Sequence, residues 1–317
     1  MSDVVGIFLS SEEHPPLDLV RFAGMAEEAG LTKAWISDHY HPWTDAQGQS
    51  PFVWSVIGGI AATTQLTVTT AVTCPTVRIH PAVVAQAAAT SAAMLPGGRF
   101  RFGVGSGENL NEHILGDGWP PTDIRLEMLE EAIDLIRELW QGKAVTWDGK
   151  HYVTHNAKLY TLPDEPPPVL VSGFGEKAIE LAARIGDGFV STSPDADHVA
   201  HYERSGGKGL KQGGVKVCWG PEEEAAKQLA HELWPNSAVG GELSQELPMP
   251  AHFEQASAKV TPDEVAESIP CGPDPERHVQ AIRAYLEAGF DEVYVSQVGP
   301  DQAGFLAFCK DEVLPRL

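Results

Sequence analysis

The stretch LTKAWISDHYHPW, residues 31–43, decides the fold of this chain. Its first half, Leu31–Ile36, is a mostly apolar run of strand length, and its second half is a polar and aromatic loop. The stretch FRFGVGSGENLNE, residues 100–112, repeats this pattern. Each places a proton-handling side chain, His39 or Glu108, where a buried strand emerges into a loop. In an α/β barrel that position is the catalytic end of the strand.

Six further apolar runs alternate with amphipathic segments, as expected for parallel strands that are buried on both faces. The expected strands are Val4–Leu9, Ala34–Ser37, Leu66–Val72, Phe100–Gly105, Val169–Ser172, Gly188–Thr192, Val215–Trp219 and Glu292–Gln297. The expected helices include Asp18–Ala29, Ala82–Met94, Arg125–Trp140, Lys177–Arg184, Glu222–Leu233 and Pro275–Ala288. The count favours an α/β fold of the closed (β/α)8 TIM-barrel type over an open, doubly wound sheet.

We expect residues 1–317 to form one barrel domain with insertions at the C-terminal face of the strands, near 141–168 and 236–266. The first insertion predicts a hairpin with its turn at Asp148-Gly149. The second lies between the last two expected strands, on the side where βα loops form the mouth. Loops of this length inside a compact domain are usually functional lids or extra helices.

Composition excludes several classes of protein. The formal charge of −22 would repel nucleic acid, and no basic aromatic stripe offsets it. No apolar stretch reaches the ~18 residues of a membrane span, and the N-terminus lacks the basic region of a signal peptide. We therefore expect a cytoplasmic protein that acts on a small molecule. The four cysteines are far apart and favour inert thiols over a disulfide framework.

His39 is the strongest candidate for catalysis. Histidine takes up a proton near neutral pH, and His39 is clustered with Asp38 and Trp43 at a strand end. A turn cap before Pro42 is the competing reading, and it is the one we favour for His41. Asp38, His39 and His41 are also metal-ligand types, but no third ligand with suitable spacing is identifiable, so we expect no metal.

Two glycine loops follow other expected strands. In the loop 105–112, glycines allow the backbone to approach a ligand, while Glu108 and Asn111 are able to hydrogen-bond to it. The loop Ser172–Gly175 precedes a helix whose free N–H groups suit a phosphate. Either loop could also be an ordinary βα turn, so neither decides the function alone.

Several segments in fixed order resemble the bacterial-luciferase-like flavin and deazaflavin oxidoreductases. They are SDHYHPW (37–43), TCPTVRIHPAVVAQAAAT (73–90), GVGSGENLNE (103–112), LWQGKAVTWDGKHY (139–152) and ARIGDGFVSTS (183–193). The resemblance is closest to the branch that uses coenzyme F420, which includes dehydrogenases of glucose 6-phosphate and of secondary alcohols. It covers nearly the whole chain except about 195–245.

The resemblance implies a (β/α)8 barrel that holds the deazaflavin F420 in its mouth and transfers a hydride between an alcohol and the deazaflavin C5. His39 would be the base, Trp43 would orient the substrate, Glu108 would donate a proton to the cofactor, and Glu12 would shape the substrate side. The implied cofactor-binding residues are Asp38, Ala71, Val72, Ser106, Gly107, Asn111, Ser172, Gly173, Phe174 and Gly175. The resemblance also implies a non-proline cis peptide at Ala71-Val72 and a homodimer.

One departure from the family pattern concerns the substrate. The members that oxidise glucose 6-phosphate hold its phosphate with two lysines and an arginine, and local alignment puts Asp195, Ser244 and Ser268 there. None of these is a cation, so glucose 6-phosphate is disfavoured and a neutral alcohol or sugar-like substrate is expected. The alternatives left open are an FMN-dependent monooxygenase, an F420H2-dependent reductase of a carbonyl or alkene, and a non-catalytic flavin-binding protein.

Overall fold

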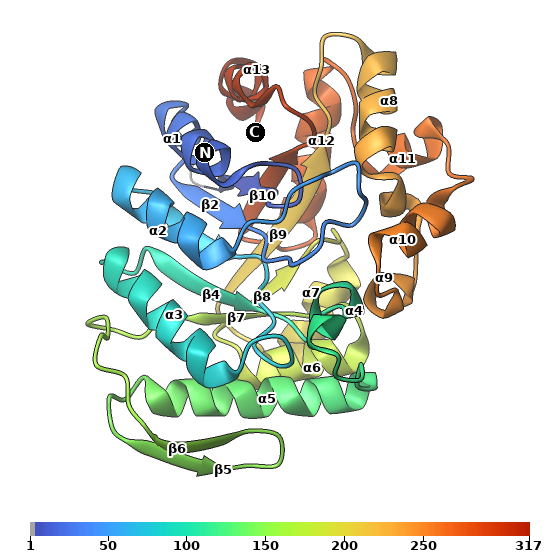
Figure 1. Ribbon diagram of the computed structural model, residues 1–317. Coiled ribbons are helices and arrows are strands. Elements are labelled where there is room, and N and C mark those ends of the chain that lie inside the picture. The colour runs from blue at the N-terminus through green and yellow to red at the C-terminus, as the bar shows by residue number, and fades with distance from the viewer. Residues whose placement is uncertain (1–3) are drawn as a thin grey trace.

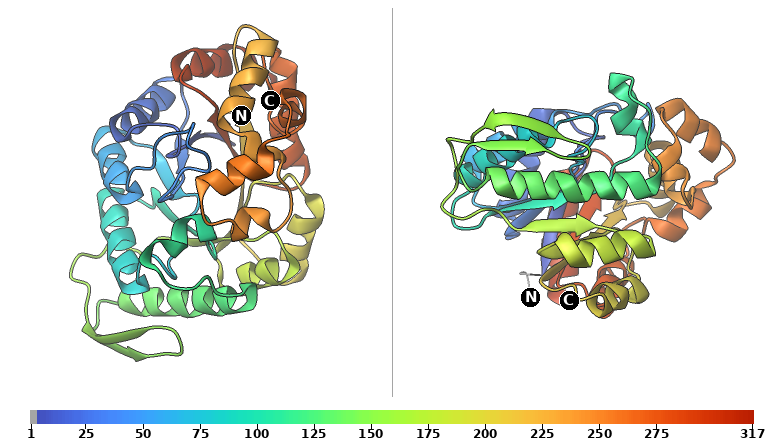
Figure 2. Two further views of the ribbon diagram at one scale, coloured as in Figure 1. Left: turned by 45° about the vertical axis from the view of Figure 1, so that its right-hand side comes forward. Right: turned by 90° about the horizontal axis from the view of Figure 1, so that it is seen from below.

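Over residues 4–317, the computed structural model has eight parallel strands that close into a barrel, with helices packed around it (Figures 1 and 2). The neighbour order runs β1-β2-β3-β4-β7-β8-β9-β10 and returns to β1. The strands are β1 (Val5–Leu9), β2 (Lys33–Ile36), β3 (Thr67–Thr70), β4 (Phe100–Val104), β7 (Val169–Ser172), β8 (Gly188–Ser191), β9 (Leu210–Val217) and β10 (Glu292–Gln297). This arrangement confirms the predicted (β/α)8 barrel.

The larger helices form the outer layer. They are α1 (Pro16–Glu28), α2 (Val53–Thr63), α3 (Pro81–Met94), α5 (Thr122–Leu139), α6 (Glu176–Ile185), α7 (Ala196–Arg204), α8 (Glu223–Leu233), α12 (Pro275–Glu287) and α13 (Gln302–Phe308). After α13 come the π-helix η3 (Cys309–Val313) and the 3-10 helix η4 (Leu314–Arg316). The main apolar core lies between this layer and the outward faces of the strands.

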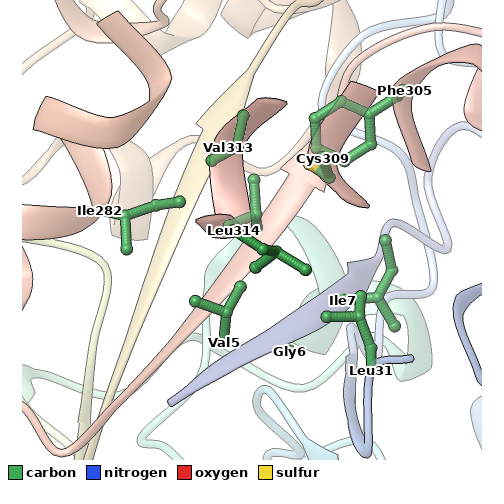
Figure 3. A pocket seen from close by; sticks show the side chains of 10 residues that line it. Val5, Gly6, Ile7, Leu31, Ile282, Phe305, Cys309, Val313 and Leu314 are labelled. Atoms are coloured by element: carbon green, nitrogen blue, oxygen red, sulfur yellow. The ribbon is translucent and has the colours of Figure 1, made fainter. Parts of the chain in front are cut away.

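A small apolar cavity marks this core near the start of β1 (Figure 3). Val5 and Ile7 line it from the strand, and Ile282, Phe305 and Val313 line it from the covering helices. Its lining is almost wholly hydrocarbon, so it offers packing space and no chemistry.

The barrel interior is filled by aromatic side chains, for which glycines make room. The rings of Trp35 and Tyr294 stack at 4.6 Å between centroids. A Cβ added at Gly214 would come within 2.3 Å of Trp35, and one added at Gly6 would come within 2.6 Å of Tyr294. The glycines are therefore required by close packing inside the barrel.

A polar cluster lies below this layer, at the N-terminal ends of the strands. Glu292 accepts hydrogen bonds from Lys33 Nζ at 2.6 Å, Arg101 Nη1 at 2.6 Å and the Tyr294 hydroxyl at 2.8 Å. Because the buried carboxylate is paired with cations and hydrogen-bonded, its burial is tolerated. The cluster closes the end of the barrel opposite the mouth.

The largest differences from the sequence prediction concern one strand and three helices. β9 begins at Leu210, five residues before the predicted start, because Gly213 and Gly214 resemble a turn but lie within the strand. A Cβ at Gly213 would come within 2.3 Å of Tyr285, so here too glycine makes room for a ring. α2, α7 and α13 were not among the predicted helices. The α2 segment VWSVIGGIAAT is apolar nearly all round and has no polar face to reveal its period.

The two insertions are attached at different ends of the barrel. Residues 141–168 form the expected hairpin, in which β5 (Val145–Asp148) pairs with β6 (Val153–Ala157). It joins the end of α5 to the start of β7, so it is rooted at the N-terminal end of the strands and lies along α5, with Trp147 Nε1 donating to Glu131 (Figure 1). This differs from the prediction that both insertions lie at the C-terminal face, because a segment between a helix and the next strand leaves from the opposite end.

The second insertion does lie at the mouth, and its helices lie inside the ring of outer helices in the left view of Figure 2. Its short helices are η2 (Pro235–Ala238), α9 (Leu243–Glu246), α10 (Pro250–Ser257) and α11 (Pro262–Ser268). α9 reaches the loop after β4, where Asn109 Nδ2 donates to the Glu246 carbonyl at 2.9 Å. α4 (Asn109–Glu112) and η1 (His113–Leu115) complete this side of the mouth.

Candidate active site

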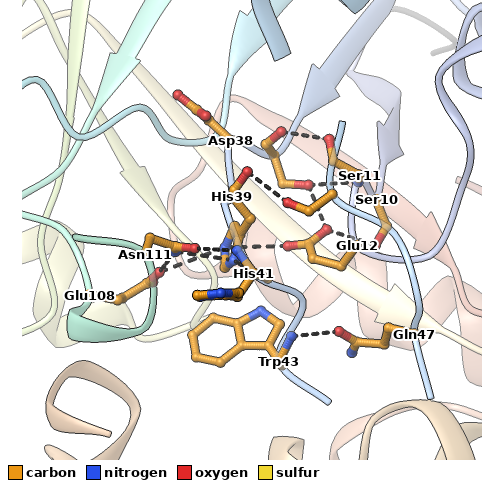
Figure 4. Close-up of polar contacts among 12 residues, drawn as sticks. Ser10, Ser11, Glu12, Asp38, His39, His41, Trp43, Gln47, Glu108 and Asn111 are labelled. Carbon is orange, nitrogen blue, oxygen red and sulfur yellow. Dashed lines mark hydrogen bonds and ion pairs between the residues drawn. The ribbon is translucent and has the colours of Figure 1, made fainter. Parts of the chain in front are cut away.

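His39 lies between two carboxylates at the mouth of the barrel (Figure 4). Its Nε2 atom is 3.3 Å from Glu12 Oε1 and 3.7 Å from Glu108 Oε2. The three residues come from the loops that follow β1, β2 and β4, so separate strands bring them together. The structure therefore places three of the four predicted catalytic residues in one cluster.

The other side of the imidazole ring is held by the loop backbone and an amide. His39 Nδ1 is 3.2 Å from the His41 carbonyl oxygen and 3.2 Å from Asn111 Nδ2. Asn111 Oδ1 accepts from the Tyr40 backbone N–H at 2.8 Å, which fixes the amide. When Nδ1 carries a proton, it donates to the His41 carbonyl; when Nδ1 is unprotonated, it accepts from the Asn111 amide. Either tautomer of His39 therefore has a partner.

The two carboxylates beside His39 have opposite pKa shifts. Burial raises the pKa of Glu12, but the charge of His39 and hydrogen bonds from Ser37 and Ser10 outweigh it, so this pKa is lowered. Burial, together with the charge of Glu12, raises the pKa of Glu108 against the effect of His39. Carboxylates whose pKa values are pushed apart are suited to different protonation roles.

Trp43, the fourth predicted catalytic residue, lies against His39 with 5.1 Å between ring centroids. Its indole also meets Phe253 of α10 edge-on at 5.1 Å. The backbone N–H of Trp43 donates to Gln47 Oε1 at 2.8 Å, and Gln47 Nε2 donates to the Leu233 carbonyl. The second insertion thus forms the wall against which Trp43 rests.

Asp38 is turned away from the His39 cluster, as Figure 4 shows. Its carboxylate accepts from Arg78 Nη2 at 2.9 Å and from the Thr73 hydroxyl at 2.8 Å. Arg78 also lies 3.6 Å from Glu112, whose pKa is raised to about 7 by burial in spite of the arginine. Asp38 therefore belongs to a buried charge cluster under the predicted cofactor side.

The end of β3 and the loop after β4 lie side by side. The Ala71-Val72 peptide bond is cis, which confirms that prediction. A Cβ added at Gly105 would come within 2.8 Å of Val72, and one added at Gly107 would come within 2.6 Å of Cys74. The backbone around Ser106 is thus packed against the β3 loop, and the predicted cofactor residues of both loops share one rim.

The loop Ser172–Gly175 leads directly into α6. Gly175 is the N-cap of this helix with no side-chain cap, and a Cβ there would have open space around it. The ring of Phe174 is 44% exposed. Free N–H groups at a helix start favour an anion, and an exposed ring offers a surface for a flat group. These residues fit a cofactor that carries a planar ring and a phosphate.

The residues considered as metal ligands do not converge. Asp38 is committed to Arg78 and Thr73, while His41 Nδ1 lies 2.8 Å from the Leu110 carbonyl oxygen. Across residues 4–317, no group of three histidine, cysteine or acidic side chains is arranged to hold a metal ion.

Lys216 is a residue of the mouth that the sequence analysis missed. It lies near the end of β9, partly buried, with its ammonium group 4.2 Å from the centroid of the Trp234 ring. Burial lowers the pKa of Lys216, opposed by the charges of Glu12, Glu13 and Glu108. The available sign was a lysine inside an apolar strand. Because the predicted strand began at Val215, Lys216 was expected near its N-terminal end, whereas in the observed strand it lies near the C-terminal end, at the mouth.

Fold and site together define an α/β barrel with an acid–base cluster where the strands end. The chain belongs to the family of luciferase-like monooxygenases, whose model matches residues 4–292. It is 36% identical to an F420-dependent glucose-6-phosphate dehydrogenase of Nakamurella multipartita, over 98% of this chain and 96% of that one. A second dehydrogenase of this name, from Beutenbergia cavernae, is 35% identical over 99% and 97% of the two chains.

Among solved structures, the fold is similar to an F420-dependent secondary alcohol dehydrogenase in complex with an F420-acetone adduct. The TM-score is 0.91 and the identity 29%, covering 99% of each chain. An F420-dependent tetrahydromethanopterin reductase of Methanopyrus kandleri has a TM-score of 0.76 at 20% identity, which shows the shared fold.

Proposed function

We propose that this protein is an F420-dependent oxidoreductase that acts on the CH–OH group of a neutral alcohol or sugar-like substrate. The observation that carries the proposal is the position of His39 Nε2, between Glu12 and Glu108 at the mouth. The F420-dependent activities named for the relatives at 36% and 35% identity support the choice of cofactor over FMN.

Deazaflavin supplies a carbon centre, C5, that accepts or returns a hydride as a two-electron carrier. The Ala71-Val72 segment, Ser106, Gly107 and Asn111 would line one side of its ring, and the loop Ser172–Gly175 would hold its phosphate. Asp38 would support the cofactor side indirectly, through its buried cluster with Arg78 and Glu112.

Alcohol oxidation requires two proton transfers, and different residues of the site would carry out each of them. With its Nδ1 proton donated to the His41 carbonyl, His39 has Nε2 free to take the hydroxyl proton of the substrate. Glu12, whose pKa is lowered, is ionised beside the imidazolium that forms and stabilises it. Glu108, whose pKa is raised by burial and by the charge of Glu12, would be the donor of a proton to the ring of the cofactor. Trp43 would orient the substrate over the ring.

The positions aligned with the family's phosphate ligands support a substrate without phosphate. Asp195 caps α7 through the N–H groups of Asp197 and His198, and it would repel a dianion. Ser268 donates to the Val265 carbonyl, and Ser244 donates to the Gly241 carbonyl. Lys216 is a cation of the mouth, but Glu12, Glu13 and Glu108 surround it.

Cofactor choice is tested by titrating the apo-protein with F420 and with FMN. We expect F420 to bind more tightly and its absorbance to fall on addition of an alcohol substrate. Tight FMN binding together with oxygen consumption in the presence of a flavin reductase would overturn the proposal in favour of a monooxygenase.

Substrate choice gives a second prediction. We expect kcat/KM for at least one neutral alcohol or unphosphorylated sugar to exceed that for glucose 6-phosphate, because the phosphate would meet Asp195 and two serines. An alcohol panel with F420, read at the deazaflavin absorbance, measures this. A higher kcat/KM for glucose 6-phosphate than for every neutral compound would contradict the assignment.

We further propose that the chain is a single domain, cytoplasmic, and assembled as a homodimer. No helix in residues 4–317 is long and apolar enough to cross a membrane. Size-exclusion chromatography with light scattering tests the assembly, since a monomer at micromolar concentration would contradict it.

A further inference from the structure

Glu13 follows Glu12 directly in the sequence, but it takes no part in the proton transfers proposed above. Its carboxylate accepts from Trp234 Nε1 at 2.7 Å and from the Gly299 backbone N–H at 2.8 Å. Trp234 lies at the end of α8, and Gly299 lies in the loop after β10. One side chain of the β1 loop thus joins two other segments of the mouth.

Trp234 lies between an apolar cluster and a cation. The indole is 3% exposed and packs with Cys218, Ala226, Ala230, Val265, Ile269, Cys271 and Val298. Against its ring lies the ammonium group of Lys216 at 4.2 Å, a cation–π geometry. The orientation of this indole therefore sets where the ammonium group of Lys216 rests.

The groups that face Glu13 are known from each element packed against it. Glu12 lies on the same loop, Lys216 lies on β9, and Cys218 directly follows that strand. Burial raises the pKa of Glu13 to about 7, against hydrogen bonds from Gly299 and Trp234, and Glu12 adds to the rise. Near neutral pH the carboxylate is therefore close to half protonation.

We propose that Glu13 is a positioning residue that fixes the indole of Trp234 and, through that ring, places the ammonium group of Lys216 against an oxygen of the substrate. This inference rests on the proposed function for its kinetic consequence. The structural part, the Glu13–Trp234–Lys216 contact, does not depend on which cofactor or substrate is used.

Both oxygens of Glu13 accept hydrogen bonds, so a carboxylate suits this position better than an amide. In Glu13→Gln one of the two N–H donors, that of Trp234 or that of Gly299, would face the amide NH2 group instead of an acceptor. The indole would lose its fixed orientation while the volume of the side chain stays the same. Misplacement of a binding group affects substrate affinity more than the chemical step when the base is untouched.

The kinetic test uses Glu13→Gln, Trp234→Phe, the double variant and the surface control Glu28→Gln, all in the full chain with F420 and its best alcohol. We expect each single variant to raise KM about tenfold with kcat within about threefold, and the double variant to add little, since both break one contact. Glu28→Gln is expected to match the wild type. A fall in kcat at constant KM, or fully additive single effects, would overturn the proposal.

The second test needs no turnover, so it separates failure of this inference from failure of the proposed function. In 15N-labelled protein, the indole N–H resonance of Trp234, assigned by its loss in Trp234→Phe, should shift with pH with a midpoint near 7. In Glu13→Gln the midpoint should disappear. A resonance that titrates equally in both proteins would overturn the proposal even if the alcohol kinetics agreed with it.

Discussion

His39→Ala is expected to lower kcat for alcohol oxidation by about 10²–10⁴-fold, the usual contribution of a positioned general base. The imidazole is the group whose free nitrogen faces the mouth, with its other nitrogen held by the His41 carbonyl and Asn111. Binding of F420 should change little, because the residues proposed to hold the ring and phosphate lie on the β3, β4 and β7 loops. Pre-steady-state absorbance of F420 measures the hydride step directly.

A matched control is His155→Ala, since His155 is exposed on β6 of the hairpin, away from the mouth. It should leave kcat and KM at wild-type values. Glu12→Gln in the His39→Ala background should cost little more, because the carboxylate stabilises an imidazolium that can no longer form. Turnover by His39→Ala at the wild-type rate would contradict the role of the histidine as the base.

The strands were predictable because a parallel barrel buries both faces of each strand and leaves near-continuous apolar runs. Val169–Ser172 and Glu292–Gln297 were predicted with the observed bounds. The start of β9 was missed because Gly213 and Gly214 are placed there by the rings of Tyr285 and Trp35, which lie far away in the sequence. Local pattern carries no information about such contacts.

The candidate site likewise has a part that the sequence predicts and a part that depends on contacts between distant residues. His39 and Glu108 stand at strand ends that the sequence marks, so their convergence follows from the barrel. The pairing of Asp38 with Arg78 and the contact of Glu13 with Trp234 join residues 40 and 221 positions apart. They depend on loop paths that no spacing rule predicts. Hence the acid–base cluster was predicted, while the charges that support it came only from the structure.

Arg78→Met is expected to lower the free energy of unfolding by about 3–5 kcal/mol at pH 8, the cost of breaking a buried ion pair from one side. The side chains of Arg78, Asp38 and Glu112 are 6%, 0% and 1% exposed, so the two carboxylates would stay buried without their cation. Methionine keeps most of the volume, which separates loss of charge from loss of packing. Urea unfolding followed by tryptophan fluorescence measures the change.

The pH dependence of this deficit identifies its cause. The pKa of Glu112 is raised from 4.5 to about 7 in the folded protein. Between these two pH values the folded protein keeps a proton on Glu112 that the unfolded chain has already lost. Below pH 7 Glu112 is therefore increasingly neutral, and the deficit of Arg78→Met should be smaller at pH 6 than at pH 8. Arg21→Met, which breaks the exposed pair with Asp18, should cost less than about 1 kcal/mol at either pH. If the deficit of Arg78→Met were also below about 1 kcal/mol, or if it grew as the pH falls, Arg78 would not stabilise the fold by compensating the buried carboxylates.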